Sequence, residues 1–449
     1  MAGPFSAVAW HALCSNIPYY RVSVLAGGVG RRRPARLLGK NDDPGNREED
    51  MDHDKLLKQV IAHDPVRNAR ATRRDVLRGM GAGALALAAG GAGFAPGTAA
   101  AARDLRMLTW DGYVDPRILD GFTAAYDTSV SYELHTSDPD SVNKLRAGQT
   151  KIWDIINLNN PWAREMMWPE QLIVELPRDR FEPYFDKMLP MFAPPYKWAM
   201  SIDNEHLLGV CQRVDTFDFV VNTDAISAND AKKTGWDLFL DPKMKGRYGI
   251  LAYDNWNIMH LCMISGLHPF KEKSDEEVAK FEATAKQVIN GAKLISADFV
   301  QLNLAMLNGE IDACVSGGTY SLSAARLDDN WNLYAVTPEK GPADGKGGIN
   351  WIELNSAVNN PELHPKAFDW LEYILQPETS YYVATAGGFL LPVGQMAQPE
   401  LLSKFTKEEL DSFQWDEFDY RIAHSVEFDV VPEYNKLYDI YTAALREKA

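Results

Sequence analysis

Short apolar runs alternate with amphipathic stretches along residues 103–449. Three of the runs are only a few residues long and have strand-like composition, which predicts strands beginning at Leu105, Trp153 and Phe217. The run at Trp153 is apolar on both faces, as in a parallel sheet covered on both sides. Two longer stretches have apolar residues at helical spacing, which predicts helices beginning at Pro116 and Asp275, the second ending near Gly291. This alternation predicts an α/β fold.

The same alternation continues towards the C-terminus. The stretch from Phe299, FVQLNLAMLNGEIDACVSGG, predicts a helix, a turn at Asn308-Gly309 and then a buried strand. The stretch PKAFDWLEYILQPETSYYVATAGG predicts two helices broken at Pro377, because proline cannot continue a helix. Gly387-Gly388 closes the second helix.

Residues 1–102 form an expected leader. Arg73 and Arg74 precede a stretch without charged residues in which Gly and Ala dominate, so the stretch is too weakly apolar for a good membrane span. A basic front, a mildly apolar middle and small residues at its end are typical of an export signal. The pattern resembles a twin-arginine signal, which implies the twin-arginine translocase as an export partner. A flexible linker after an N-terminal domain is the alternative.

We expect the signal to occupy residues 51–102, with cleavage before Arg103. Residues 1–50 show no pattern typical of a domain, so we expect Met51 to be the true start and residues 1–50 to be spurious.

The amino-acid composition argues against some classes of binding partner. The chain has 46 Lys and Arg against 62 Asp and Glu, a formal net charge of −16. Such an acidic chain is unsuited to nucleic acid, whose recognition depends on clustered basic residues. After the leader, the cysteines are Cys211, Cys262 and Cys314, without the spacing of a metal site, and we expect three buried thiols.

The usual catalytic patterns are missing from the sequence. The histidines after residue 102 are not spaced as helical metal-ligand pairs, and there is no HExxH motif, so we expect no metal. Ser316 lacks the preceding glycine of a nucleophile elbow, and GPADGKGG lacks the spacing of a phosphate-binding loop. A pair of glycosidase carboxylates stays open, because carboxylates are plentiful. We expect no cofactor.

Aromatic residues stand beside polar residues at the expected ends of four strands. In open α/β sheets, ligands bind outside the carboxyl ends of the strands, so these clusters could converge on one cleft. Taken singly, each aromatic residue is more often part of a core than of a site, and it is the repetition that favours a site. The clusters are Trp110, Asp111 and Tyr113; Asn159, Asn160 and Trp162; Asp254, Asn255, Trp256 and Asn257; and Trp351 and Glu353.

The order of these segments resembles the periplasmic solute-binding proteins of ABC importers, and within them the spermidine/putrescine-binding type. The resemblance covers nearly the whole chain after the leader and is most specific in its last segment. The segments that carry it are LTWDGYVDPRILDGF, WDIINLNNPWAREMM, GWDLFLDPKMKGRYGIL, LNLAMLNGEIDACVSGGTYS and GGINWIELNSAVNNPELHPKAFDWLEYILQPETSYYVATAGGF.

The resemblance implies a type II periplasmic-binding fold, with two hinge-linked α/β lobes that enclose a ligand between them. Lobe 1 would be residues 103–216 plus 350–397, and lobe 2 residues 217–349 plus 398–449. The protein would be a periplasmic monomer without enzymatic activity that delivers a small molecule to an ABC-type membrane permease.

The resemblance also implies roles for particular residues. An aromatic box would hold the ligand and carboxylates would hold its amines, because a cation over an aromatic face gains about 0.5–2 kcal/mol. Two departures weaken the polyamine interpretation: Gly112 and Asn257 stand where the family has carboxylates. The sequence therefore favours a small polar, amine-containing solute, of which a polyamine is one possibility. The box would be Trp110, Tyr113, Trp351 and Phe389, and the carboxylates Glu353 and Asp254.

Two other functions stay open at this stage. Twin-arginine export often serves redox enzymes, so an exported enzyme of unknown reaction is the alternative, although the sequence has no dinucleotide fingerprint and no cluster of thiolates. A receptor that signals in chemotaxis without transport would use the same lobe closure.

Overall fold

The structure is a computed structural model that describes residues 103–135 and 137–448. The expected leader, with its twin-arginine signal and its proposed start at Met51, lies outside the described residues.

Ten strands join in one mixed, curled sheet. Its main path runs in the order β2-β1-β3-β9-β4-β7-β5-β6, with β10 paired to β9 and β8 paired to β4. The strands are β1 (Leu105–Thr109), β2 (Val130–Leu134), β3 (Ile155–Asn159), β4 (Val210–Asn222), β5 (Tyr248–Leu251), β6 (Leu294–Ser296), β7 (Ala313–Gly317), β8 (Leu333–Val336), β9 (Gly348–Ala357) and β10 (Ser425–Glu427).

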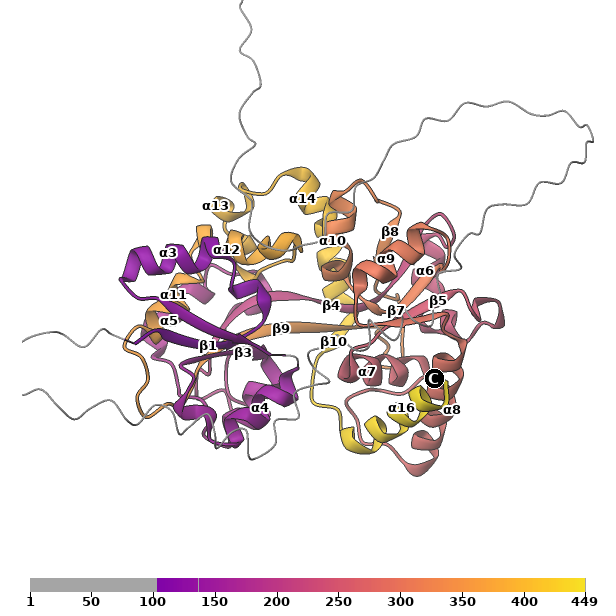
Figure 1. Cartoon of the computed structure of the whole chain (residues 1–449), viewed down its shortest axis with the longest axis horizontal. Coiled ribbons are helices and arrows are strands. Elements are labelled where there is room, and N and C mark those ends of the chain that lie inside the picture. Colours follow the sequence, from indigo (N-terminus) through magenta and orange to yellow (C-terminus); the bar gives the residue numbers. More distant parts are fainter. Residues whose placement is uncertain (1–102, 136, 449) are drawn as a thin grey trace, which may run out of the picture. The chain divides into compact units, whose positions relative to one another are not determined.

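Two long antiparallel strands, β4 and β9, connect the two ends of this sheet. Residues 210–217 of β4 pair with β9, whereas residues 218–222 pair with β7 and β8. β9 in turn pairs with β3, which is parallel to β1. Figure 1 shows β4 and β9 running between a group that contains β1 and β3 and a group that contains β5 and β7. The sheet therefore has two halves that share only these crossing strands and the contacts around them.

Helices cover the sheet. α3 packs on α12 in the half that contains β1, while α16 packs on α8 and α14 on α10 in the other half (Figure 1). The helices are α3 (Pro116–Tyr126), α4 (Asp138–Arg146), α5 (Arg178–Phe185), α6 (Ala228–Thr234), α7 (Asp254–Ile264), α8 (Asp275–Gly291), α9 (Phe299–Leu307), α10 (Thr319–Leu327), α11 (Ala367–Tyr373), α12 (Pro377–Ala384), α13 (Pro399–Leu402), α14 (Lys407–Ser412), α15 (Phe418–Ala423) and α16 (Tyr434–Lys448).

The expected helices are confirmed where local signals are strong. α3 begins at Pro116 behind the N-cap Asp115, whose side chain accepts a hydrogen bond from the Arg117 amide. α8 ends at Gly291 as predicted, and α12 begins at Pro377. Gly387 has a φ of 62°, the left-handed conformation expected after the end of α12.

The strand predicted from Phe217 is much longer than expected, because β4 begins at Val210. Gln212, Arg213 and Asp215 interrupt the apolar pattern there, yet all of β4 is buried. Burying charged groups requires partners, which the local sequence does not show. The sequence predicts Trp351 and Glu353 beyond the end of a strand, but both lie inside the buried strand β9. As in β4, the local sequence does not show the partner that a buried charge requires.

Two further sequence expectations concern the core and the membrane. Cys211, Cys262 and Cys314 are free and buried, as predicted. Within residues 103–135 and 137–448, no helix combines the length and apolar character that a membrane span needs.

A buried ion pair fixes α15 to β4. Arg421 and Asp215 are both almost fully buried, and their side chains are paired. The Arg421 guanidinium also donates to the Phe413 carbonyl oxygen at 3.2 Å. Removing one partner of such a pair leaves the other charge buried without compensation.

Replacing Arg421 by glutamine is therefore expected to lower the free energy of unfolding by about 3–5 kcal/mol, as measured by urea denaturation. Arg146→Gln is the control, because the Arg146–Glu170 pair has side chains that are 40% and 37% exposed, and such pairs contribute about 0–1 kcal/mol. Equal losses in the two variants would show that the buried pair does not stabilise the fold.

Candidate ligand-binding site

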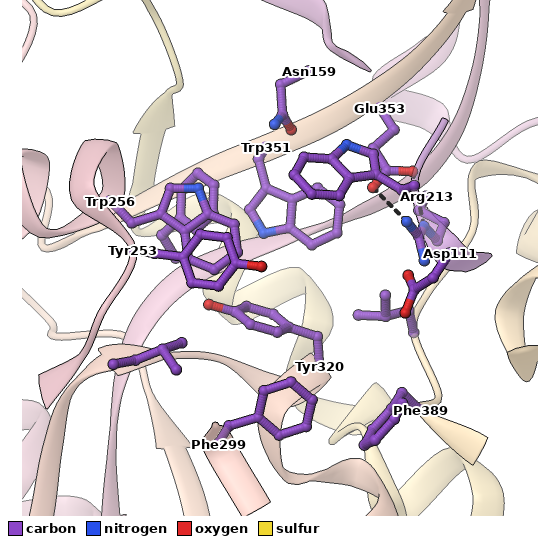
Figure 2. Close-up of a pocket in the computed structure, with 14 residues that line it drawn as sticks. Asp111, Asn159, Arg213, Tyr253, Trp256, Phe299, Tyr320, Trp351, Glu353 and Phe389 are labelled. Atoms are coloured by element: carbon purple, nitrogen blue, oxygen red, sulfur yellow. Dashed lines mark hydrogen bonds and ion pairs between the residues drawn. The ribbon is translucent and has the colours of Figure 1, made fainter. Parts of the chain in front are cut away.

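A cavity of about 150 Å³ lies where the two halves of the sheet meet at β4 and β9 (Figure 2). Sites that hold drug-sized ligands typically measure about 300–1,000 Å³, so this cavity suits a smaller molecule. It is lined by Trp110, Asp111, Asn159, Arg213, Phe217, Leu251, Tyr253, Trp256, Phe299, Tyr320, Trp351, Glu353, Phe389 and Leu391.

The lining residues come from both halves of the sheet. Trp110 and Asp111 follow β1, and Asn159 ends β3. Tyr253 and Trp256 lie at the start of α7, beyond the end of β5. The crossing strands contribute side chains from their middle, so the cavity is bounded by the ends of parallel strands and by the strands that join the halves.

Aromatic rings form most of the wall. The Tyr253 and Trp256 rings are stacked, with centroids 4.3 Å apart, and Tyr320 meets Trp256 edge-on at 5.5 Å. Phe299 and Phe389, one from each half, meet edge-to-face at 5.0 Å. Figure 2 shows these rings around the same space. Such faces attract a cation and the apolar stem that carries it.

Arg213 and Glu353 form a bidentate ion pair at the edge of the cavity. Arg213 Nε and Nη2 donate to the two Glu353 carboxylate oxygens, each at 2.8 Å, and the side chains are only 9% and 6% exposed. Tyr113 Oη donates to Glu353 Oε2 at 3.0 Å. Burial opposes the charged form of Arg213, but Glu353, Tyr113 and Asp111 together outweigh this effect and raise the pKa of Arg213. In the bidentate pair, the formal charges of Arg213 and Glu353 offset each other.

Gly112 is explained by the position of this arginine. A Cβ atom at residue 112 would lie 2.0 Å from Arg213 Nη1, so the guanidinium fills the space of any side chain there. At residue 112, where the resemblance implies a carboxylate, the structure therefore has the guanidinium of Arg213.

Several polar atoms of the lining residues have no partner. The indole Nε1 atoms of Trp110 and Trp351, the Tyr320 hydroxyl and Asn159 Oδ1 are buried without a hydrogen bond to any described residue. Buried polar groups without partners are uncommon, so these atoms are candidates for hydrogen bonds with a bound ligand or with water.

Of the thirteen residues that the sequence analysis names for the site, seven line the cavity: Trp110, Asp111, Asn159, Trp256, Trp351, Glu353 and Phe389. Asn255 does not line it and is buried at the start of α7. Glu353 is less available for the predicted contact with an amine, because Arg213 already donates hydrogen bonds to both of its carboxylate oxygens.

The other five predicted residues do not line the cavity. Tyr113 is buried behind it and supports Glu353. Asn257 is buried inside its own half, where its amide donates to the Leu251 carbonyl oxygen at 2.7 Å. Asp254 is exposed at the start of α7 and interacts with the Tyr438 hydroxyl. Asn160 and Trp162 are buried beyond the end of β3. Residues that are adjacent in sequence therefore have side chains in different places, because a helical turn after each strand points successive side chains in different directions.

The sequence analysis missed several lining residues, of which Arg213, Phe217 and Tyr320 are the most important for the chemistry. One feature of the sequence could have identified Arg213, because a lone arginine in a buried run needs a buried partner. Tyr320 is the second residue of α10, which begins at Thr319 shortly after β7 ends at Gly317. Phe299 is the first residue of α9, so its helical pattern concealed its role.

Two other clusters resemble functional groups without forming a site. His260 Nδ1 lies 2.7 Å from Ser316 Oγ, but both residues are buried and neither lines the cavity, so no substrate reaches them. Ligand atoms of Asp203, Glu205 and His206 lie within 4.8 Å of one another. Asp203 and Glu205 are exposed, and Asp203 accepts hydrogen bonds from Ser201 and from the Glu205 amide as in an ordinary turn. We assign no metal to them.

A second layer of titratable groups supports Asn159 and Trp110. Asp138 accepts a hydrogen bond from the Asn159 amide nitrogen Nδ2 at 2.7 Å, and burial raises the pKa of Asp138 to about 7. The Trp110 ring packs on His135 at 4.1 Å. Burial lowers the pKa of His135 to about 4, so this imidazole is neutral at pH 7.

The sequence matches a known protein family, and the structure is similar to those of known proteins. The sequence model of a family described as bacterial extracellular solute-binding protein matches residues 117–409. No curated protein sequence matches the chain. The structure is similar to that of a putative spermidine/putrescine ABC transporter from Listeria monocytogenes, with 16% identity and a TM-score of 0.59, covering 76% of this chain and 99% of that one.

Two other solved structures show the range of proteins with this fold. The spermidine/putrescine substrate-binding protein PotD from Streptococcus pneumoniae has 17% identity and a TM-score of 0.56, covering 78% of this chain and 100% of its own. The protein MotA from A. tumefaciens, in complex with glucopine, has 12% identity and a TM-score of 0.53, covering 77% and 100%. These similarities show the shared two-lobed fold, as the sequence predicted.

Asp138 gives the site a testable pH dependence. Below about pH 4 its carboxyl is protonated in both states. Between pH 4 and 7 the folded state keeps a proton that the unfolded state releases, so the free energy of unfolding falls as pH rises through this window. We expect the fall between pH 4.5 and 7.5, measured by urea denaturation, to be smaller in Asp138→Asn than in the wild type by on the order of 1–4 kcal/mol.

The control is Asp140→Asn, an exposed change two residues along α4. It should follow the wild type. If Asp138→Asn also follows the wild type, burial does not perturb this carboxyl.

Proposed function

The chain belongs to the family of bacterial extracellular solute-binding proteins, and we propose that it is the receptor of an ABC importer that captures a small polar, amine-containing solute. The observation that carries this proposal is the cavity at the crossing strands, whose wall comes from both halves of the sheet.

The aromatic wall supports an amine as part of the ligand. Stacked Tyr253 and Trp256 and the neighbouring Tyr320 offer ring faces, and Asp111 offers a carboxylate. A cation against such rings gains about 0.5–2 kcal/mol, and a charge-assisted hydrogen bond adds to this in a dry cavity. The fold alone does not select a ligand, since its members include proteins named for spermidine and putrescine and one bound to glucopine.

The proposed mechanism is capture by closure of two lobes. Lobe 1 would be residues 103–216 plus 350–397, and lobe 2 residues 217–349 plus 398–449. The change of partner within β4 supports the boundary, because pairing with β9 ends at Phe217 and pairing with β7 begins at Asp218. The packing of α16 on α8 and of α14 on α10 supports assigning the C-terminal helices to lobe 2.

Contacts across the cavity support this mechanism of closure. The Phe299 and Phe389 rings touch across the proposed lobe boundary, and the Leu390 amide donates to Ser323 Oγ at 2.8 Å. A ligand that bridges the lobes would add to these contacts and to the Arg421–Asp215 pair, which also crosses the proposed boundary, and would shift the equilibrium towards the closed state.

Transport would require partners outside the cavity. We propose that a twin-arginine signal directs the protein to the periplasm and that the closed form delivers its ligand to an ABC-type permease. Its membership of an extracellular solute-binding family supports a location outside the cytoplasm.

A thermal-shift screen of amines, amino acids, opines and neutral sugars on the mature protein tests this proposal, because a ligand that binds only the folded state raises stability by RT ln(1 + [L]/Kd). For any solute found, we expect Trp110→Ala to weaken binding at least about tenfold, since its ring lines the cavity. The unliganded variant should stay folded, with a smaller loss than the about 3–5 kcal/mol of a fully buried tryptophan.

Trp331→Ala is the matched control, because Trp331 is 38% exposed and does not line the cavity. It should bind as the wild type does. A screen without any ligand would contradict the proposed function. Collapse of the Trp110→Ala fold would instead assign Trp110 to the core.

A further inference from the structure

The charges that line the cavity leave one carboxylate free. Arg213, Glu353 and Asp111 are the charged lining residues, and the first two neutralise each other in a bidentate pair. Among the described residues, no side chain forms an ion pair or hydrogen bond with the Asp111 carboxylate, which is exposed to solvent but close enough to Arg213 for its negative charge to raise the pKa of the guanidinium. The cavity therefore has the net charge of a single carboxylate, which one ammonium group balances.

A second ammonium group would meet an arginine. The guanidinium of Arg213 lies against Gly112, and Nη1 makes no hydrogen bond to the Glu353 carboxylate. Nη1 can only donate hydrogen bonds, and it carries positive charge. It repels an amine and suits an oxygen atom.

The unpartnered indole N–H groups also require an oxygen acceptor on the ligand. Trp110 Nε1 and Trp351 Nε1 are buried donors without an acceptor, and an indole N–H cannot accept a hydrogen bond. A protonated alkylamine has only donors, so a polyamine leaves both indoles unsatisfied. Asn159 Oδ1 is the opposite case, because it is a buried acceptor and can receive a hydrogen bond from an ammonium or hydroxyl group.

We infer that the ligand carries a single ammonium group together with at least one oxygen acceptor, such as a hydroxyl, carbonyl or carboxylate, and that it is not a polyamine. The ammonium group is held by Asp111 and the aromatic faces, and the oxygen by Arg213 Nη1 and the indole N–H groups. This inference rests on the proposed function, because it takes the cavity to be the solute site.

Three ligands with the same length of chain test the inference. Putrescine, 4-aminobutan-1-ol and 4-aminobutanoate share one ammonium group and differ at the other end, which is an ammonium, a hydroxyl or a carboxylate group. We expect at least one of the two oxygen-bearing amines to bind the mature protein at least about tenfold more tightly than putrescine, as measured by calorimetric titration at pH 7.

Several outcomes overturn the inference. Putrescine that binds as tightly as both oxygen-bearing amines, or more tightly, contradicts it. So does a protein that binds none of the three but binds a neutral sugar in the thermal-shift screen, a result that keeps the receptor function. A protein that binds no solute at all contradicts both the inference and the proposed function.

Variants of Arg213 identify the cause of the preference. Arg213→Gln removes the positive charge and frees Glu353, so putrescine should gain at least about tenfold relative to 4-aminobutan-1-ol. Arg213→Lys keeps the charge and should keep the preference of the wild type. Arg146→Gln, which removes a surface arginine, should also leave the preference unchanged.

A preference that is the same in Arg213→Gln and in the wild type would overturn the role of the arginine. If Arg213→Gln does not fold, the comparison of the three ligands in the wild type decides whether the inference holds.

Discussion

The ion pair between Arg213 and Glu353 is the interaction on which the site depends. Neither charge can be buried alone at acceptable cost, and the antiparallel pairing of β4 with β9 brings them together from positions 140 residues apart. The pair brings a positive charge to the cavity wall and removes the negative charge that Glu353 would otherwise supply. Its proposed effect on ligand choice would therefore follow from the way the two strands cross, whereas Asp111 and the aromatic rings of the lining would contact the ammonium group.

The same crossing relates the fold to the proposed activity. Because β4 and β9 belong to both halves of the sheet, they can act as the hinge while the ends of β1, β3 and β5 carry the aromatic and polar side chains that face each other. A ligand placed between them would stabilise the proposed closed form through contacts that neither half makes alone. This arrangement requires no bond to be made or broken, which agrees with membership of a solute-binding family.

Much of the fold could be predicted from the sequence, whereas only part of the site could. Capping residues and prolines determined the ends of α3, α8 and α12, since these signals act locally. Trp110, Trp256 and Trp351 were found because aromatic residues recur near strand ends. Arg213 was missed, and Glu353 was read as free, because their pairing is set by the register between two strands distant in sequence. Asn257 was expected to face the ligand, but the first turn of α7 directs it into the core.

A crystal structure of the mature protein with the solute that it retains on purification would test the account most directly. The account predicts one ammonium group against Asp111, solute oxygens within hydrogen-bonding distance of Arg213 Nη1 and the indole nitrogens, and an intact pair between Arg213 and Glu353. A solute bound away from this cavity, or an amine inserted between Arg213 and Glu353, would contradict it.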